Sequence, residues 1–115
     1  MKRLVRSVMH ALKGILYTLR NERNFQVEVT VAGAIFLLML WLPLSRIEES
    51  LLIIAVTMVL VLELINTATE RIMDILKPRV HPYARVVKDV VAGAVLVASG
   101  GAVLLGLLIL GPHLF

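Results

Sequence analysis

Four polar side chains recur along a segment that is otherwise apolar, and their types suit catalysis or ion binding. They are Glu63, Asn66, Glu70 and Asp74, in the stretch LELINTATERIMD. Steps of three, four and four residues place them within an arc of roughly 80° on one face of a helix. We call these four residues the polar stripe. Carboxylates and an amide on one face can bind a divalent cation, orient a phosphate group or accept a proton.

The polar stripe is unfavourable in an apolar setting unless it faces a partner. An ionisable group at the centre of a membrane-spanning helix costs at least ~2.5 kcal/mol, so such groups normally face a cavity or a counter-charge. Neighbouring carboxylates also repel one another, which calls for a metal ion, or for Lys or Arg from another helix. Lys88, beside Asp89, is a candidate from the next apolar segment. Mg²⁺ with phosphate fits this set, and so does a cation or proton pathway.

Individual members of the polar stripe differ in how strongly they indicate function. Glu63 follows a run of aliphatic residues and is followed by two more, which favours a functional role. Asn66 also fits a simple hydrogen bond between helices, and Asp74 also fits a solvated surface position. We interpret His81 as a loop or interface residue, because no second histidine stands at a metal-ligand spacing from it.

The composition places the polar stripe in an integral membrane protein. The chain has 115 residues, of which 59% are hydrophobic and only 17% are charged. A soluble domain is less apolar and more charged. A chain this short cannot bury a large core alone, which favours oligomerisation. The absence of cysteine excludes disulfides and thiolate metal sites. Basic residues are not interleaved with aromatic ones, which argues against nucleic-acid binding and, with a net charge of +4, favours anionic lipid head groups.

The hydropathy pattern predicts one all-α membrane domain over residues 1–115. Residues 1–24 are basic, with apolar residues at helical spacing, and predict an amphipathic helix on the membrane surface. Membrane-spanning helices are predicted at 27–44, at 50–76 with a polar extension, and at 86–110. Each is near the ~20 residues that cross ~30 Å of hydrocarbon.

The distribution of charge predicts the orientation of these spans. Basic residues crowd the N-terminal segment and the connection after the second span, whereas the first connection has Arg46 against two glutamates. Since basic segments stay on the cytoplasmic side, we expect a cytoplasmic N-terminus and an external C-terminus. The polar stripe then lies at the cytoplasmic face.

Three segments of the chain resemble the small prokaryotic diacylglycerol kinase family, which includes the undecaprenol kinases. ELINTATERIMD is similar to the Glu-Asn-Glu-Asp signature of this family. HPYARVVKDVVAGAVLVA resembles its block with a Lys-Asp pair at the head of the last span, and RNERNFQVE resembles the segment entering the first span. The resemblance extends from about Arg3 to Leu108. It implies a homotrimer in a bacterial inner membrane, with active sites between subunits at the cytoplasmic face.

The resemblance also implies an activity, the MgATP-dependent phosphorylation of a lipid alcohol, and a role for each matching residue. Glu63 matches the catalytic carboxylate that takes the proton from the lipid hydroxyl. Glu22 and Glu70 match the carboxylates that bind Mg²⁺ or a similar divalent ion. The resemblance places the following residues in the nucleotide and phosphate site or lining it: Lys88, Asp89, Asn66, Asp74, Arg3, Asn21 and Glu28.

The sequence leaves alternatives open for the lipid substrate and for the class of function. HPYARVVKD and NERNF look closer to the undecaprenol-kinase branch, and diacylglycerol is the alternative substrate. A small oligomeric cation or proton-coupled transporter with Glu63 as carrier is an alternative of a different class, and a non-enzymatic assembly subunit is another. The chain has neither a P-loop nor a G-x-G-x-x-G motif. We interpret the small residues of SGGAVLLG as sites of close helix packing.

Overall fold

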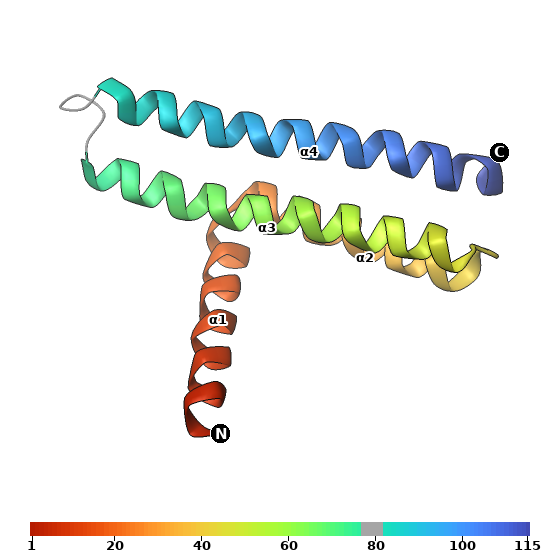
Figure 1. Ribbon diagram of the computed structural model, residues 1–115, viewed down its shortest axis with the longest axis horizontal. Helices are drawn as coiled ribbons and strands as arrows, with labels where there is room; N and C mark the ends of the chain where they lie inside the picture. The colour runs from red at the N-terminus through yellow and green to blue at the C-terminus, as the bar shows by residue number, and fades with distance from the viewer. Residues whose placement is uncertain (77–81) are drawn as a thin grey trace.

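The computed structural model describes residues 1–76 and 82–115, and the described chain is helical almost throughout (Figure 1). The helices are α1 (Lys2–Asn21), α2 (Arg23–Trp41), α3 (Arg46–Leu76) and α4 (Pro82–Leu114). Three of them, α2, α3 and α4, are long and apolar enough to cross a membrane. The prediction of an all-helical protein with three membrane spans is therefore confirmed. His81 lies outside the described residues.

The break between α1 and α2 falls at a single residue, Glu22. Its backbone is extended, with φ −116° and ψ 112°, and it is at once the C-cap of α1 and the N-cap of α2. Side chains satisfy carbonyl groups that the end of α1 would otherwise leave free. Asn21 donates to the carbonyl oxygen of Tyr17, and Gln26 reaches back to that of Leu19. Polar side chains thus make a sharp joint here without glycine or proline.

The connection from α2 to α3 is short and carries a clear helix start. Pro43 lies just beyond the end of α2, where a residue without an N–H group is tolerated. Ser45 and Glu48 then form a reciprocal capping box. The Glu48 N–H donates to Ser45 Oγ at 3.1 Å, and the Ser45 N–H donates to Glu48 Oε1 at 3.0 Å. Two backbone donors are thus satisfied at the start of α3, the helix that carries the polar stripe.

Helix α3 is the centre of the arrangement. Both α2 and α4 pack along it, and α1 crosses the C-terminal half of α3 and projects away from the other three helices (Figure 1). At the end of α3 nearest Arg46, Leu52 packs in a buried cluster with Ile109 and Leu110 of α4. Most apolar side chains elsewhere are exposed, among them Leu96, Val97 and Leu108 of α4. So much exposed apolar surface requires lipid or other subunits to cover it.

The membrane helices differ in their ends from the predicted spans: α2 (Arg23–Trp41) begins and ends earlier than the predicted 27–44, whereas α3 and α4 extend beyond their apolar segments. Helix α3 begins at Arg46, ahead of the predicted 50, and α4 spans Pro82–Leu114, beyond the predicted 86–110 at both ends. Helix α4 continues through Pro112, where the proline removes one hydrogen bond near the helix end. At about 1.5 Å per residue, α3 and α4 are roughly 46 and 50 Å long, which exceeds the ~30 Å hydrocarbon layer. Hydropathy marks only the part that requires lipid, whereas the helix continues into the polar interface.

Candidate active site

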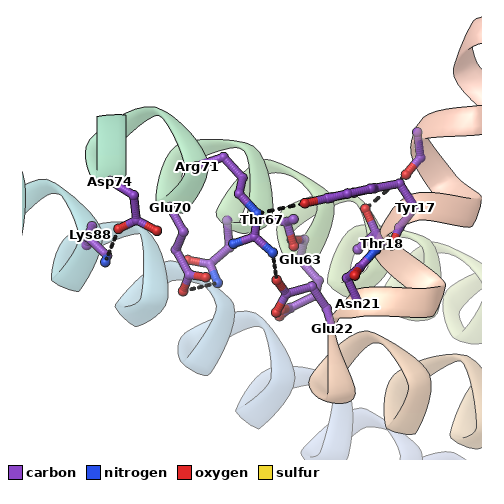
Figure 2. A network of polar contacts seen from close by, with 12 residues as sticks. Tyr17, Thr18, Asn21, Glu22, Glu63, Thr67, Glu70, Arg71, Asp74 and Lys88 are labelled. Carbon is purple, nitrogen blue, oxygen red and sulfur yellow. Dashed lines mark hydrogen bonds and ion pairs between the residues drawn. The ribbon is translucent and has the colours of Figure 1, made fainter. Parts of the chain in front are cut away.

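The first two residues of the polar stripe lie in the most deeply buried polar region of the described chain. Glu63 is 2% exposed, Asn66 is 7% exposed, and Thr67, on the adjacent turn, is 4% exposed. Figure 2 shows Glu63 and Thr67 on the face of α3 that meets the joint between α1 and α2. Thr67 donates to the backbone carbonyl of Glu63 at 3.1 Å, so its hydroxyl is satisfied within the helix. Because both residues are buried and share one face of α3, the side chains of Glu63 and Asn66 point toward the neighbouring helices and away from the protein surface.

The depth of these residues follows from the helix rise. If one hydrocarbon boundary lies near Ser50, Glu63 lies about 20 Å further along α3, and Glu70 lies about 30 Å along it. Glu63 is then inside the apolar layer, and Glu70 is at its opposite boundary. On this placement the polar stripe runs from the edge of the apolar layer into it.

Oxygen acceptors converge at the inner part of the polar stripe. Asn66 Nδ2 donates to Glu70 Oε1 at 3.3 Å, which ties two members of the stripe together. Glu22 and Glu70 lie close enough to Glu63 for their charges to act on its carboxylate. Within residues 1–76 and 82–115, Asn66 Oδ1 and Glu28 Oε2 are buried without a hydrogen-bond partner. Buried acceptors normally have partners, so these two atoms indicate where a donor or a cation belongs.

Arg71 supplies a positive charge beside this group. Its Nη2 lies 2.5 Å from Glu22 Oε1, and its Nε donates to the Tyr17 hydroxyl at 3.0 Å (Figure 2). The guanidinium carbon is 5.8 Å from the centre of the Tyr17 ring, within cation–π range. The predicted counter-charge for the carboxylates was a metal or a basic residue of another helix. The structure adds an arginine of α3 itself, which reaches across to α1 and its joint with α2.

Lys88 meets the polar stripe at its outermost member. Its Nζ lies 2.9 Å from Asp74 Oδ1, and the pair joins the start of α4 to the end of α3. The Asp74 side chain is 56% exposed, so the pair is solvated. Glu70 precedes Asp74 by one helical turn. Lys88 therefore lies at the solvated end of the polar stripe, about one helical turn beyond Glu70.

The remaining sequence-predicted residues are distributed unevenly around this centre. Asn21 lies at the joint, and Glu28 borders a groove of about 320 Å³ between α2, α3 and α4. Asp89 is exposed beside Lys88 on α4. Arg3 is at the far end of α1, roughly 27 Å from Asn21 by the helix rise, and is not brought to the site within one chain.

Two residues of the polar network were missed by reasoning from the sequence. Neither Arg71 nor Tyr17 is among the site residues predicted from the sequence. Arg71 follows Thr67 by one helical turn, so it lies at the edge of the buried face, and this spacing is a usable signal for it. Tyr17 carries no comparable signal, because its role depends on how α1 crosses α3.

The donor set is suited to a hard divalent ion. Glu22, Glu70 and Asn66 offer only oxygen ligands on this side of α3, and Mg²⁺ prefers oxygen and uses one or two carboxylates with phosphate and water. No group of three or more Asp, Glu or His side chains that could hold a metal occurs in the described part of the chain. The residues thus fit an ion that arrives with a phosphate ligand, and they do not form a closed all-protein metal cage.

The comparison with known proteins decides the class of this site. The family model described as Prokaryotic diacylglycerol kinase matches residues 9–110. This chain belongs to the prokaryotic diacylglycerol kinase family. It is 38% identical over 114 residues to the Undecaprenol kinase of Bacillus subtilis (strain 168), covering 99% of this chain and 93% of the relative. The resemblance inferred from the polar stripe is thereby confirmed.

Two diacylglycerol kinases are also similar to the chain. The Diacylglycerol kinase of Synechocystis sp. is 34% identical over 96% of this chain and 64% of its own length. That of Escherichia coli (strain K12) is 28% identical over 96% of this chain and 91% of its own length. As a member of this family of multi-pass membrane lipid kinases, the chain is an enzyme that uses ATP. Its family membership argues against the transporter and assembly-subunit alternatives.

Proposed function

We propose that this member of the prokaryotic diacylglycerol kinase family phosphorylates undecaprenol, producing undecaprenyl phosphate. One observation carries the choice of lipid. The chain is 38% identical to an undecaprenol kinase across almost the full length of both proteins, and its identity to the two diacylglycerol kinases is lower. The position of Glu63 supports a lipid acceptor, because this buried carboxylate follows the aliphatic run of a candidate membrane span.

In this proposal, Glu63 is the general base. Its carboxylate accepts the proton of the lipid hydroxyl as the hydroxyl oxygen attacks the γ-phosphorus, and the bond from that phosphorus to the bridging oxygen of ADP breaks. Asn66 orients the reactants through its free Oδ1 and its amide group. Burial at 2% exposure excludes bulk water, which would otherwise compete with the lipid as phosphate acceptor. Phosphoryl transfer chiefly requires such positioning, together with screening of charge.

Of the charged residues around Glu63, some would bind the divalent ion and others would bind the nucleotide. Glu22 and Glu70 would hold Mg²⁺ or a similar divalent ion, which, when bound, neutralises charge on the β- and γ-phosphates. Lys88 would bind phosphate oxygens at the mouth of the site, with Asp74 fixing its ammonium group. Asp89 and Asn21 would line the nucleotide site, and Glu28 would contact the lipid.

The assembly and the orientation belong to the same proposal. Three membrane helices with mostly exposed apolar faces cannot enclose both ATP and a lipid, which supports a homotrimer with sites between subunits. Arg3, distant from the site of its own chain, would then serve a neighbouring one. The basic end of α4, with Arg85 and Lys88, supports a cytoplasmic site and N-terminus with an external C-terminus. The amphipathic helix α1 would lie in the cytoplasmic interface, since it projects across the axis of the spans (Figure 1).

A competition between lipids tests the proposed substrate. Purified protein in detergent micelles or nanodiscs receives radiolabelled ATP, Mg²⁺, and equal mole fractions of undecaprenol and diacylglycerol. We expect undecaprenol to take most of the label, and Glu63→Gln to slow the labelling of both lipids by about 10²- to 10⁴-fold. Preferential labelling of diacylglycerol would overturn the assignment of the lipid. Labelling of neither lipid by well-folded protein would overturn the kinase mechanism.

Diacylglycerol is the second candidate, and a specific observation favours it. The family description names diacylglycerol kinase, and relatives of that name cover 96% of this chain. Both lipids present a hydroxyl group at the interface, so the same Glu63 chemistry serves either one. The competition experiment separates them directly.

A further inference from the structure

Arg71 makes the contacts that fix the side chain of Glu22. Glu22 lies between two helices and makes no side-chain capping bond to either. Its carboxylate is held instead by Arg71 Nη2 at 2.5 Å, while Arg71 Nε is anchored on the Tyr17 hydroxyl at 3.0 Å. The Glu22 side chain is 20% exposed and that of Arg71 is 41% exposed. The contact therefore joins the α1–α2 joint to the cytoplasmic end of α3.

The chemistry of a guanidinium group makes this contact directional. The group is planar and presents its N–H donors in a rigid fork, so anchoring Nε on Tyr17 also sets where Nη2 points. A lysine at this position would keep the charge but would bind as a point charge without the fork. A simple pair between partly exposed charges contributes only about 0–1 kcal/mol to stability. The direction of the Arg71–Glu22 contact therefore says more about its role than its small contribution to stability does.

The contact uses one oxygen of the carboxylate. Arg71 binds Glu22 Oε1, and a carboxylate has a second oxygen with further acceptor sites. Glu22 also lies within electrostatic range of Glu63, the most buried carboxylate of the polar stripe. A residue that binds one oxygen of a metal-binding carboxylate fixes the other, and removal of such partners typically weakens metal affinity 10- to 100-fold.

We propose that Arg71, anchored by Tyr17, is a positioning residue that holds Glu22 so that its second oxygen binds the divalent ion of the bound nucleotide. This inference rests on the proposed kinase function. It assigns Arg71 no contact with the reacting atoms. It differs from two other accounts of the same contact. In one, Arg71 competes with the ion for Glu22, and in the other the pair only ties α1 to α3.

The three accounts predict different effects of removing the guanidinium group. Metal affinity should fall if Arg71 positions Glu22, rise if Arg71 competes with the ion, and stay unchanged if the pair is only structural. The variants are Arg71→Gln, Arg71→Lys and Tyr17→Phe, with Arg46→Gln as the matched control at the opposite end of α3. Binding of Mn²⁺ in the presence of a non-hydrolysable ATP analogue is followed by electron paramagnetic resonance on the intact purified protein. The Mg²⁺ concentration for half-maximal kinase activity is measured in parallel. Size-exclusion chromatography and circular dichroism check that each variant is assembled and folded.

We expect Arg71→Gln to weaken Mn²⁺ binding and to raise the half-maximal Mg²⁺ concentration by about 10- to 100-fold. The rate at saturating Mg²⁺ should fall much less. Tyr17→Phe should shift both values in the same direction by a smaller factor, Arg71→Lys should restore part of the loss, and Arg46→Gln should match the unsubstituted protein. Tighter Mn²⁺ binding by Arg71→Gln would overturn the inference in favour of competition. An unchanged affinity with a lower melting temperature would overturn it in favour of a structural tie.

The experiment also separates this inference from the function on which it rests. If the unsubstituted protein phosphorylates a lipid alcohol and Arg71→Gln leaves the metal dependence unchanged, the inference fails and the proposed function stands. If the unsubstituted protein phosphorylates no lipid alcohol, the proposed function fails, and the metal titration alone reports whether Arg71 positions Glu22.

Discussion

Lys88 Nζ lies 2.9 Å from Asp74 Oδ1, and this ion pair joins the first turns of α4 to the last turns of α3. Asp74 belongs to the polar stripe and follows Glu70 by one helical turn, about 6 Å along the axis. The pair thereby holds an ammonium group near the carboxylate proposed to bind the metal. A phosphate group entering between them would meet a positive charge on one side and an ion held by carboxylates on the other.

The two partners of this pair should respond differently to substitution. We expect Lys88→Gln to raise the KM for ATP about 10- to 100-fold, as the loss of a hydrogen bond of about 1.5–3 kcal/mol to a charged group predicts. Asp74→Asn should lower the free energy of unfolding by less than about 1 kcal/mol, because the pair is solvated. Steady-state kinetics and thermal unfolding in detergent measure the two effects, with Arg85→Gln as a control on the same helix. An unchanged KM for ATP in Lys88→Gln would contradict the phosphate-binding role.

Glu63→Gln tests the proposed general base. The substitution keeps the size of the side chain and removes its ability to accept a proton, so kcat should fall by about 10²- to 10⁴-fold. Assembly should persist, because an amide fits the same buried position. Rapid-quench kinetics and size-exclusion chromatography measure the two properties. Glu49→Gln, at the other end of α3, is the control and should stay fully active. Loss of assembly without a loss of activity per assembled molecule would point to a structural role for Glu63.

Removal of divalent ions should stop the reaction and leave the fold intact. The described residues contain no cluster of three or more acidic or histidine side chains that could hold a metal, so we expect the ion to arrive with the nucleotide. EDTA should abolish lipid phosphorylation without changing the far-ultraviolet circular dichroism, and Mg²⁺ should restore activity. Unfolding by EDTA would show instead that a metal stabilises the fold.

Ser45→Ala should destabilise the protein without altering catalysis. The substitution removes the Ser45 Oγ acceptor of the capping box with Glu48, which should cost about 0.5–2 kcal/mol. The box lies at the end of α3 opposite the polar stripe, so KM and kcat should remain unchanged. Thermal unfolding in detergent gives the stability, and Ser50→Ala is the control for loss of a hydroxyl from the same helix. A change in KM for ATP would show coupling between the two ends of α3.

Much of this architecture could be predicted from local pattern. The long aliphatic runs predict the membrane spans, because a chain in hydrocarbon must satisfy its backbone within each helix. The spacing of Glu63, Asn66 and Glu70 places them on one face once the segment is helical. The S-x-x-E sequence at Ser45 likewise specifies its own hydrogen bonds. The ends of α3 and α4 were predicted less well, since both helices extend beyond their apolar parts into the interface.

The sequence by itself determined which residues are acidic, how they are spaced along α3 and which segments belong in the membrane. The tertiary structure decided which charges meet. Arg71 reaches Glu22 and Tyr17 only because the chain bends at Glu22 and sends α1 across α3, and that angle depends on contacts between residues about fifty positions apart. Helical periodicity is a local property that can be read from neighbouring residues. Contacts across a joint depend on packing between helices, which no single segment encodes.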